Sequence, residues 1–279
     1  MTEPIRVSWS MIRAHEDCRQ KTALLRQGKR AKATNLRTYF HGMVVDSVMR
    51  AWLANPDRAS LDMRTMVDEH IHRGQQEAVA SGDGVVRWRG VSDRESLREF
   101  STELVHRLEP LLTELVLPYA YRSGHRFSHP LTLPDGTEIR LVGEMDLLVH
   151  EPAGWAVWDL KGTKDDSYWR KVTGQLVFYD LATKLEHGEH PYRAGLIQPM
   201  CKEPLLTFDF NADDRRAMLT RILRYVSDVQ AGRDECREDT AGCTRCDVSH
   251  ACPRYTAKPG QNTLSLSAAL RHAATESRT

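Results

Sequence analysis

Residues 143–161 read GEMDLLVHEPAGWAVWDLK, and this stretch is the most informative about the central sheet. Its two apolar runs are separated by residues 151–154, EPAG, a segment typical of a chain reversal between antiparallel strands. Because side chains alternate between the faces of a strand, Asp159 and Lys161 project from the same side. The reversal folds Asp146 back beside them. The stretch therefore predicts two carboxylates and one ammonium on a common face of a sheet.

The segments around this stretch extend the sheet and cover it with helices. Alternating apolar positions predict strands, and apolar residues spaced three to four apart predict helices. The pattern gives strands at about 126–133, 137–149, 155–161, 193–200 and 205–210, and helices at about 11–18, 39–54, 60–80, 93–117, 167–186 and 213–231. We therefore expect an α/β fold with a mixed central sheet flanked by helices and a helical N-terminal elaboration.

Composition excludes several classes of protein. The 279 residues are 41% hydrophobic and 28% charged, which is typical of a soluble globular chain and not of a disordered or fibrous one. No apolar run approaches the roughly 20 residues that cross a bilayer, and residues 1–11 lack the apolar core of a signal peptide. We expect a cytoplasmic protein, whose six cysteines would be kept reduced for metal binding or burial.

The predicted carboxylates and lysine suit phosphodiester hydrolysis. Paired carboxylates hold Mg²⁺ or Mn²⁺, and Asp146 and Asp159 can supply the oxygens. A nearby lysine can orient or deprotonate the attacking water and stabilise the charge of the transition state, and Lys161 is the candidate. An isolated D-x-K triplet is more often a surface ion pair, so the interpretation depends on the motifs around it.

Two motifs resemble the core of the PD-(D/E)XK nuclease superfamily. Residues 143–146, GEMD, resemble its G-x-x-D, and residues 159–161, DLK, resemble its (D/E)-x-K on the adjacent strand. This resemblance implies a restriction-endonuclease-like core and a metal-dependent nuclease in which Asp146, Asp159 and Lys161 are catalytic.

Two further motifs resemble the RecB-like branch of that superfamily. Residues 175–179, QLVFY, resemble its Q-x-x-x-Y, whose spacing puts Gln175 and Tyr179 on one helical face. Residues 39–44, YFHGMV, resemble its helical histidine motif, which implies that His41 joins the carboxylates as a metal ligand. The branch usually degrades DNA from its ends, so the resemblance implies a DNA exonuclease acting on single strands.

The cysteines near the C-terminus have the spacing of a metal site. Residues 243–253 contain C-x-x-C-x5-C-P, whose three soft ligands suit zinc or an iron-sulfur cluster. A zinc site would need a fourth ligand, which His250 or Cys236 could supply. Both interpretations remain open from spacing alone.

The same segment is similar to the AddB-type and CRISPR-associated exonucleases, including phage-encoded relatives. In these, one cysteine before the nuclease core and three after it bind a 4Fe-4S cluster. The resemblance implies that Cys18, Cys243, Cys246 and Cys252 are the ligands, with Cys18 in the first helix. Such a crosslink could contribute roughly 5 kcal/mol by restricting the unfolded chain. We expect Cys201 to be a buried thiol, and Cys236 competes for a ligand position.

The expected organisation is one RecB-like nuclease domain over residues 1–256. It comprises a helical insertion at about 55–120, a nuclease core at about 121–231 and a cluster-binding segment at 236–256 that includes Cys18. Residues 257–279 form a tail rich in Ser, Thr and Ala.

The expected partner is DNA, but the sequence leaves the mode of action open. A basic run could follow a phosphate backbone or be a solvated helix face. Its members are Arg19, Lys21, Arg26, Lys29, Arg30, Lys32 and Arg37. A rival hypothesis is a non-catalytic nucleic-acid-binding subunit with a structural zinc or iron-sulfur site. The nuclease could also act within a helicase or another DNA-processing complex; because the sequence lacks G-x-x-x-x-G-K-[ST], a partner would have to supply the motor.

Overall fold

The computed structural model describes residues 3–29, 36–55, 57–58, 61–80, 91–236, 240–243, 246–253 and 255. Within these ranges, the side chains of residues 36–41, 63, 78–79, 91–93 and 240–241 are not described. None of the helices in the described ranges is long and apolar enough to cross a membrane.

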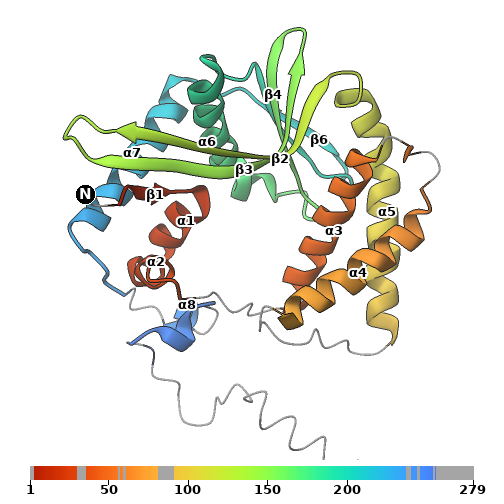
Figure 1. Cartoon of the computed structure of the whole chain (residues 1–279), viewed down its shortest axis with the longest axis horizontal. Coiled ribbons are helices and arrows are strands. Elements are labelled where there is room, and N and C mark those ends of the chain that lie inside the picture. The colour runs from red at the N-terminus through yellow and green to blue at the C-terminus, as the bar shows by residue number, and fades with distance from the viewer. Residues whose placement is uncertain are drawn as a thin grey trace, which may run out of the picture.

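A six-stranded mixed sheet forms the centre of the molecule (Figure 1). Pairings β2 to β3 and β3 to β4 are antiparallel, as expected for consecutive strands joined by turns, whereas β4 and β5 are parallel and flank α6 in the sequence. The pairing of β5 with β6 is antiparallel. The mixed sheet is therefore confirmed. Its strands are β1 (Ile5–Val7), β2 (Ala120–Thr132), β3 (Glu138–Glu151), β4 (Gly154–Leu160), β5 (Arg193–Ile197) and β6 (Leu205–Phe208).

Strand β3 organises the sheet because it pairs with three other strands. Strand β2 follows it over nearly its whole length, from Ala120 opposite His150 to Thr132 opposite Glu138. On the other edge, β1 pairs with residues 139–141 and β4 pairs with residues 147–151. The pairing with β1 was not predicted, because three residues are too few to show a strand period.

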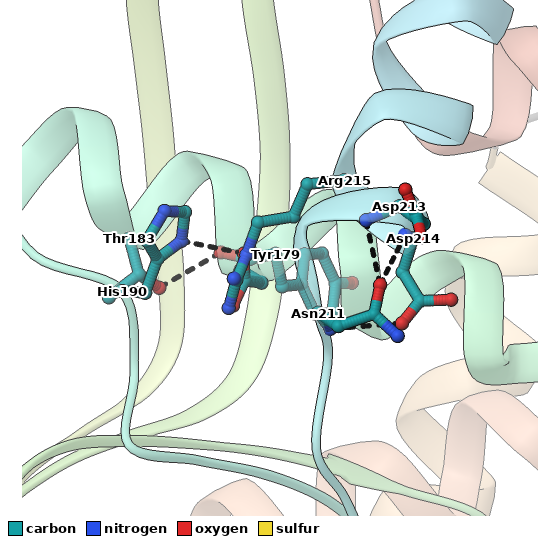
Figure 2. Close-up of polar contacts among 8 residues, drawn as sticks. Tyr179, Thr183, His190, Asn211, Asp213, Asp214 and Arg215 are labelled. Atoms are coloured by element: carbon teal, nitrogen blue, oxygen red, sulfur yellow. Dashed lines mark hydrogen bonds and ion pairs between the residues drawn. The ribbon is translucent and has the colours of Figure 1, made fainter.

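Helices cover both faces of the sheet (Figure 1). Asn211 caps the N-terminus of α7 (Ala212–Gln230), because its side chain accepts hydrogen bonds from the backbone amides of Asp213 and Asp214. The Asp214 carboxylate accepts in turn from the Asn211 backbone amide (Figure 2). The described helices are α1 (Trp9–Asp17), α2 (Arg19–Arg26), α3 (Leu36–Ala54), α4 (Met63–Ala80), α5 (Val91–Leu115), α6 (Trp169–His187), α7 (Ala212–Gln230), α8 (Thr240–Cys243) and the 3₁₀ turn η2 (Ser249–Ala251).

The two faces of the sheet pack into separate apolar cores. Helices α3, α4 and α5 enclose one core with the Trp158 and Leu160 side of β4. Helices α1, α6 and α7 enclose the other with Val157 of the same strand. This alternation along β4 agrees with the predicted faces and leaves Asp159 on the side of α6.

The first helical segment differs from the expectation that Cys18 lies within a helix. Helix α1 begins after Ser8, whose hydroxyl accepts a bond from the Met11 amide, and ends at Asp17. Cys18 has φ −166° and ψ 120°, an extended conformation that separates α1 from α2. The prediction was wrong because cysteine gives no signal in the sequence that a helix ends. The residues on either side of it, His15 and Arg19, contact Asp228, which is distant in the sequence.

Candidate functional site

The predicted acids and lysine meet where β3 and β4 lie side by side. The Lys161 ammonium lies 2.6 Å from Asp159 Oδ2 and 3.9 Å from Asp146 Oδ2. Asp146 is held in turn by the Leu160 amide, which donates to its Oδ2 at 2.8 Å. Two antiparallel strands thus bring together residues that are 13 to 15 positions apart in the chain.

The electrostatics of these groups favour a bound cation. Asp159 is fully buried, and within the described part of the chain its two oxygens accept no hydrogen bond; the Lys161 ammonium offsets their charge as an ion pair. Burial and repulsion from Asp159 raise the pKa of Asp146 to about 7. Burial lowers the pKa of Lys161, but Asp159 and Asp146 outweigh it and raise that pKa. Lys161 alone therefore does not fully stabilise two ionised carboxylates here, and a bound cation would favour the ionised form of Asp146.

Helix α6 adds the two residues of the Q-x-x-x-Y motif. Gln175 Nε2 donates to the Tyr179 hydroxyl at 2.7 Å, and that hydroxyl donates to the Glu144 carbonyl at 2.6 Å. The i,i+4 spacing predicted that these side chains share a face, and they do. Burial and the charges of Asp159 and Asp146 raise the pKa of Tyr179. It remains a neutral donor that fixes the backbone two residues before Asp146.

A buried ionic contact ties this part of α6 to α7. Asp180, beside Tyr179, is 1% exposed and accepts from Arg215 Nε at 2.8 Å and Nη2 at 3.0 Å. His190 Nδ1 lies 2.8 Å from the same carboxylate, so His190 and Arg215 approach it from the loop after α6 and from the first turn of α7 (Figure 2). This contact limits rotation of the turn that carries Tyr179.

The glycine of the G-x-x-D motif is required by packing. The Phe127 ring of β2 lies over Gly143, and a Cβ at this position would come within 2.4 Å of the ring. The same ring contacts Phe178 and Tyr179 of α6. Gly143 thus lets α6 approach β3 closely enough for Tyr179 to reach its backbone.

The third metal ligand implied by the resemblance cannot be placed. His41 belongs to α3, but its side chain lies outside the described residues. The same helix carries Asp46, which the sequence analysis did not single out. Burial and the negative charge of Asp146 raise the pKa of Asp46, although Arg50 acts in the opposite direction. Arg50 pairs with both Asp46 and Glu144, so Asp46 lies near the strand position two residues before Asp146. Its signal in the sequence is an acid amid the apolar residues of α3.

Five of the six cysteines line one cavity of about 290 Å³. They come from the junction of α1 and α2 and from the segment after α7, which lie beside each other in Figure 1. Burial and the neighbouring thiols raise the pKa of Cys236 to about 12. His250 is exposed and does not line the cavity. The cysteines are Cys18, Cys236, Cys243, Cys246 and Cys252.

A buried acid holds the two sides of this cavity together. Asp228, near the end of α7, is 2% exposed and lies 2.9 Å from His15 Nε2, 2.8 Å from Arg19 Nε and 3.0 Å from Arg233 Nε. Arg19 also pairs with Glu235 at 3.0 Å. These contacts fix the residues on both sides of Cys18 against the chain that leads to Cys236.

The remaining candidates are only partly described. Arg19 and Lys21 of the basic run are occupied in ion pairs, the latter with Asp247 at 3.0 Å. Arg26 and Lys29 are exposed, and the side chains of Arg30, Lys32 and Arg37 lie outside the described residues. Cys201 is buried as expected, and its Sγ donates to the Thr163 carbonyl.

The described residues include no preformed cage for a single metal ion. Among them, no three His, Cys, Asp or Glu side chains are placed to hold one ion together. The donor types still fit the expected groups. Two carboxylates, one of them buried with no hydrogen bond from the described residues, suit a hard divalent cation, and several thiols around one cavity suit a metal that displaces their protons.

Comparisons with known proteins agree with this geometry. A family model for the PD-(D/E)XK nuclease superfamily matches residues 6–253. A search of curated proteins gave no match. A structure from Eubacterium rectale, described provisionally as an exonuclease, is similar over 92% of this chain and 90% of its own, with a TM-score of 0.50 and 14% identity. The crystal structure of SSO0001 covers the same shares at a TM-score of 0.43 and 12% identity. The chain belongs to the PD-(D/E)XK nuclease superfamily.

Proposed function

We propose that this protein is a metal-dependent deoxyribonuclease of the RecB-like branch that degrades DNA from single-stranded ends. The observation that carries the proposal is the meeting of Asp146, Asp159 and Lys161 beside the α6 tyrosine, with no hydrogen bond from the described residues to the buried Asp159 oxygens. The solved structure described provisionally as an exonuclease supports the choice of end-directed cleavage.

Asp146 and Asp159 would hold the divalent cation, Mg²⁺ or Mn²⁺, through their carboxylate oxygens, and those of Asp159 accept no hydrogen bond from the described residues. When bound, such a cation polarises the phosphoryl group and acidifies water. Lys161 would then orient the attacking water and stabilise charge on the phosphoryl oxygens, since its ammonium stays protonated. Tyr179, aligned by Gln175, would keep the Glu144 backbone, and with it Asp146, in register.

The third cation ligand has two candidates on α3. His41 is implied by the motif, and Asp46 is favoured because Arg50 joins it to Glu144, two residues before Asp146. Separate His41→Ala and Asp46→Asn variants, titrated with Mn²⁺ by calorimetry, would distinguish them. The ligand is the residue whose loss weakens Mn²⁺ binding without lowering the melting temperature.

We also propose that Cys18, Cys243, Cys246 and Cys252 bind a 4Fe-4S cluster that joins the two ends of the nuclease. The convergence of five cysteines on one cavity supports this assignment. Zinc is the competing metal, with Cys236 as the remaining candidate for a fourth ligand. Anaerobically purified protein should be brown and contain about four irons per chain, whereas a zinc-thiolate protein would be colourless.

One assay tests the enzymatic proposal. End-labelled single- and double-stranded DNA is incubated with Mn²⁺, with Mg²⁺ and with chelator, and Asp159→Asn protein serves as the matched control. We expect short products from single strands in the metal-containing reactions, and none with chelator or with the variant. DNA binding without cleavage in every reaction would instead support a non-catalytic subunit, or one that needs a helicase or another partner.

A further inference from the structure

The side chain of Glu144 lies between two arginines from different elements. Its Oε2 is 2.8 Å from Arg126 Nε of β2, and its Oε1 contacts the Arg50 guanidinium of α3. Arg50 is also held from behind, because its Nε lies 3.0 Å from Asp46 Oδ2. The Glu144 carboxylate therefore bridges two guanidinium groups. If Glu144 moved away, Arg50 would keep Asp46 as a partner.

This bridge lies directly beside the carboxylate centre. Between the pairs Ser123–Leu147 and His125–Met145, Gly124 stands opposite Asp146. Gly124 has φ 59°, and a Cβ there would come within 2.3 Å of Arg50 Nη1 and 3.5 Å of Glu144 Oε1. The absent side chain makes room for the bridge at the strand position that faces Asp146.

The exposure of these groups leaves the bridge accessible. The Arg126 side chain is 85% exposed, and those of Arg50 and Glu144 are 35% and 28% exposed. Ion pairs in solvent contribute little net stability, so this one can be exchanged at low cost. Guanidinium groups bind carboxylate and phosphate oxygens through the same N–H donors. A phosphate can therefore take the place of the carboxylate without a new set of protein donors.

We propose that Glu144 occupies the position of a substrate phosphate, and that Arg126 and Arg50 release it to bind a backbone phosphate of the nucleic acid beside Asp146. This inference rests on the proposed nuclease function and extends it to two substrate-positioning arginines and an internal competitor. Glu144 is then a specificity element, because only a polyanion that offers a phosphate at this point displaces it. Tyr179 holds the Glu144 backbone throughout, so only the carboxylate needs to move.

The test separates competition by Glu144 from a merely structural role. Glu144→Gln removes the competing charge, and Arg50 keeps its contact with Asp46. We expect KM for single-stranded DNA to fall about two- to fivefold, the range of an exposed ion pair, while kcat stays within about twofold. Arg126→Gln should raise KM and lower the slope of log affinity against log salt by about 0.7. The controls are Glu138→Gln and Arg140→Gln, which remove one negative and one positive charge elsewhere on β3. Neither should change KM or the slope of log affinity against log salt.

A binding measurement keeps the inference independent of cleavage. Affinity for a fluorescein-labelled single-stranded oligonucleotide is measured by anisotropy in the Asp159→Asn background, with and without Glu144→Gln. Tighter binding by the double variant supports the inference, and equal or weaker binding overturns it. If the Asp159→Asn protein does not bind DNA and the wild type does not cleave it, the proposed function itself fails; if the wild type cleaves and only the Glu144 response is missing, this inference alone fails.

Discussion

The carboxylate centre and the cysteine cavity are built in opposite ways. Asp146 and Asp159 lie on two strands joined by a tight turn, just beyond the ladder between β3 and β4, and Lys161 directly follows β4, so this ladder sets their distances. The cavity instead joins Cys18 to a segment more than 200 residues later. Among the described residues, no ladder of strands links its two sides; they are held by side chains such as Asp228.

Because the two sites are built differently, catalysis and the stability of the fold should respond to different substitutions. Damage at the carboxylate centre should remove catalysis and leave the fold, because the local strand pairing does not depend on two acidic side chains. Damage at the cavity should loosen the fold and reduce catalysis only indirectly. Variants at and around the two sites test this contrast.

The largest effect is expected at the carboxylate centre. Asp146→Ala and Asp159→Ala should each lower turnover by at least about a hundredfold, because each removes a cation ligand and transition-state stabilisation. Iron content and circular dichroism should match those of the wild type. Single-turnover cleavage measures the first effect, and appreciable activity in either purified variant would refute the site assignment.

The second prediction concerns the cavity. Cys18→Ser should lose iron and visible absorption and reduce stability by up to roughly 5 kcal/mol, since the closure of a very long loop is lost. Cys201→Ser is the matched control, because Cys201 is buried away from the cavity. Iron analysis and urea unfolding check both variants. Full iron in Cys18→Ser combined with loss in Cys236→Ser would make Cys236 the fourth ligand.

The third prediction tests the side-chain clasp beside the cavity. Asp228→Asn should reduce the free energy of unfolding by about 2 to 4 kcal/mol at pH 7, allowing for the partial exposure of Arg19 and Arg233. Asp209→Asn, at an exposed loop position, should have little effect. Urea unfolding monitored by circular dichroism measures both, and equal stability of the two variants would contradict a role for Asp228 in holding the cavity closed.

The same variant has a defined pH dependence. Burial raises the pKa of Asp228, but the hydrogen bond from His15 and the charges of Arg19 and Arg233 outweigh it and leave the pKa below its usual value. A carboxyl with a depressed pKa stabilises the fold above the unfolded-state pKa and loses that contribution as pH falls through the folded-state pKa. The difference between wild type and Asp228→Asn should therefore persist at neutral pH and shrink below about pH 4.

The smallest effect is expected on α6. Tyr179→Phe removes one hydrogen bond to the Glu144 carbonyl and should lower kcat about three- to tenfold, the equivalent of about 1 kcal/mol. Tyr121→Phe is the control, because its hydroxyl makes a similar bond to the Leu53 carbonyl away from the site. Both should be slightly less stable, but only the first should turn over more slowly. Equal kcat values would show that Tyr179 acts in stability alone.

The meeting of Asp146, Asp159 and Lys161 could be predicted from the sequence because its determinants are local. Alternation along residues 155–161 placed Asp159 and Lys161 on one face, and the four-residue spacing of Gln175 and Tyr179 placed both on one side of α6. Strand and helix periods were visible because these elements pack against cores on defined faces.

Features that depend on tertiary contacts were missed. Strand β1 has three residues and pairs with β3, and the break at Cys18 lies between His15 and Arg19, which both contact Asp228. The bridge of Glu144 with Arg50 and Arg126 joins three elements, and the left-handed Gly124 that makes room for it has no marker beyond being glycine. The periodicity of apolar residues does not predict contacts of this kind between side chains of different elements.

The wide sequence separation of the cysteine cavity has a consequence for biosynthesis. The ribosome makes Cys18 first and Cys252 only 234 residues later, which at about 5 to 20 residues per second takes roughly ten to fifty seconds. During that interval β1 also lacks its partner in β3 for the first hundred or more residues. The nascent N-terminal segment must therefore remain reduced and unaggregated without its final contacts. If the proposed four-cysteine cluster forms, it can be inserted only after Cys252 has been made, and the supply of iron would then limit the amount of mature protein at a late stage.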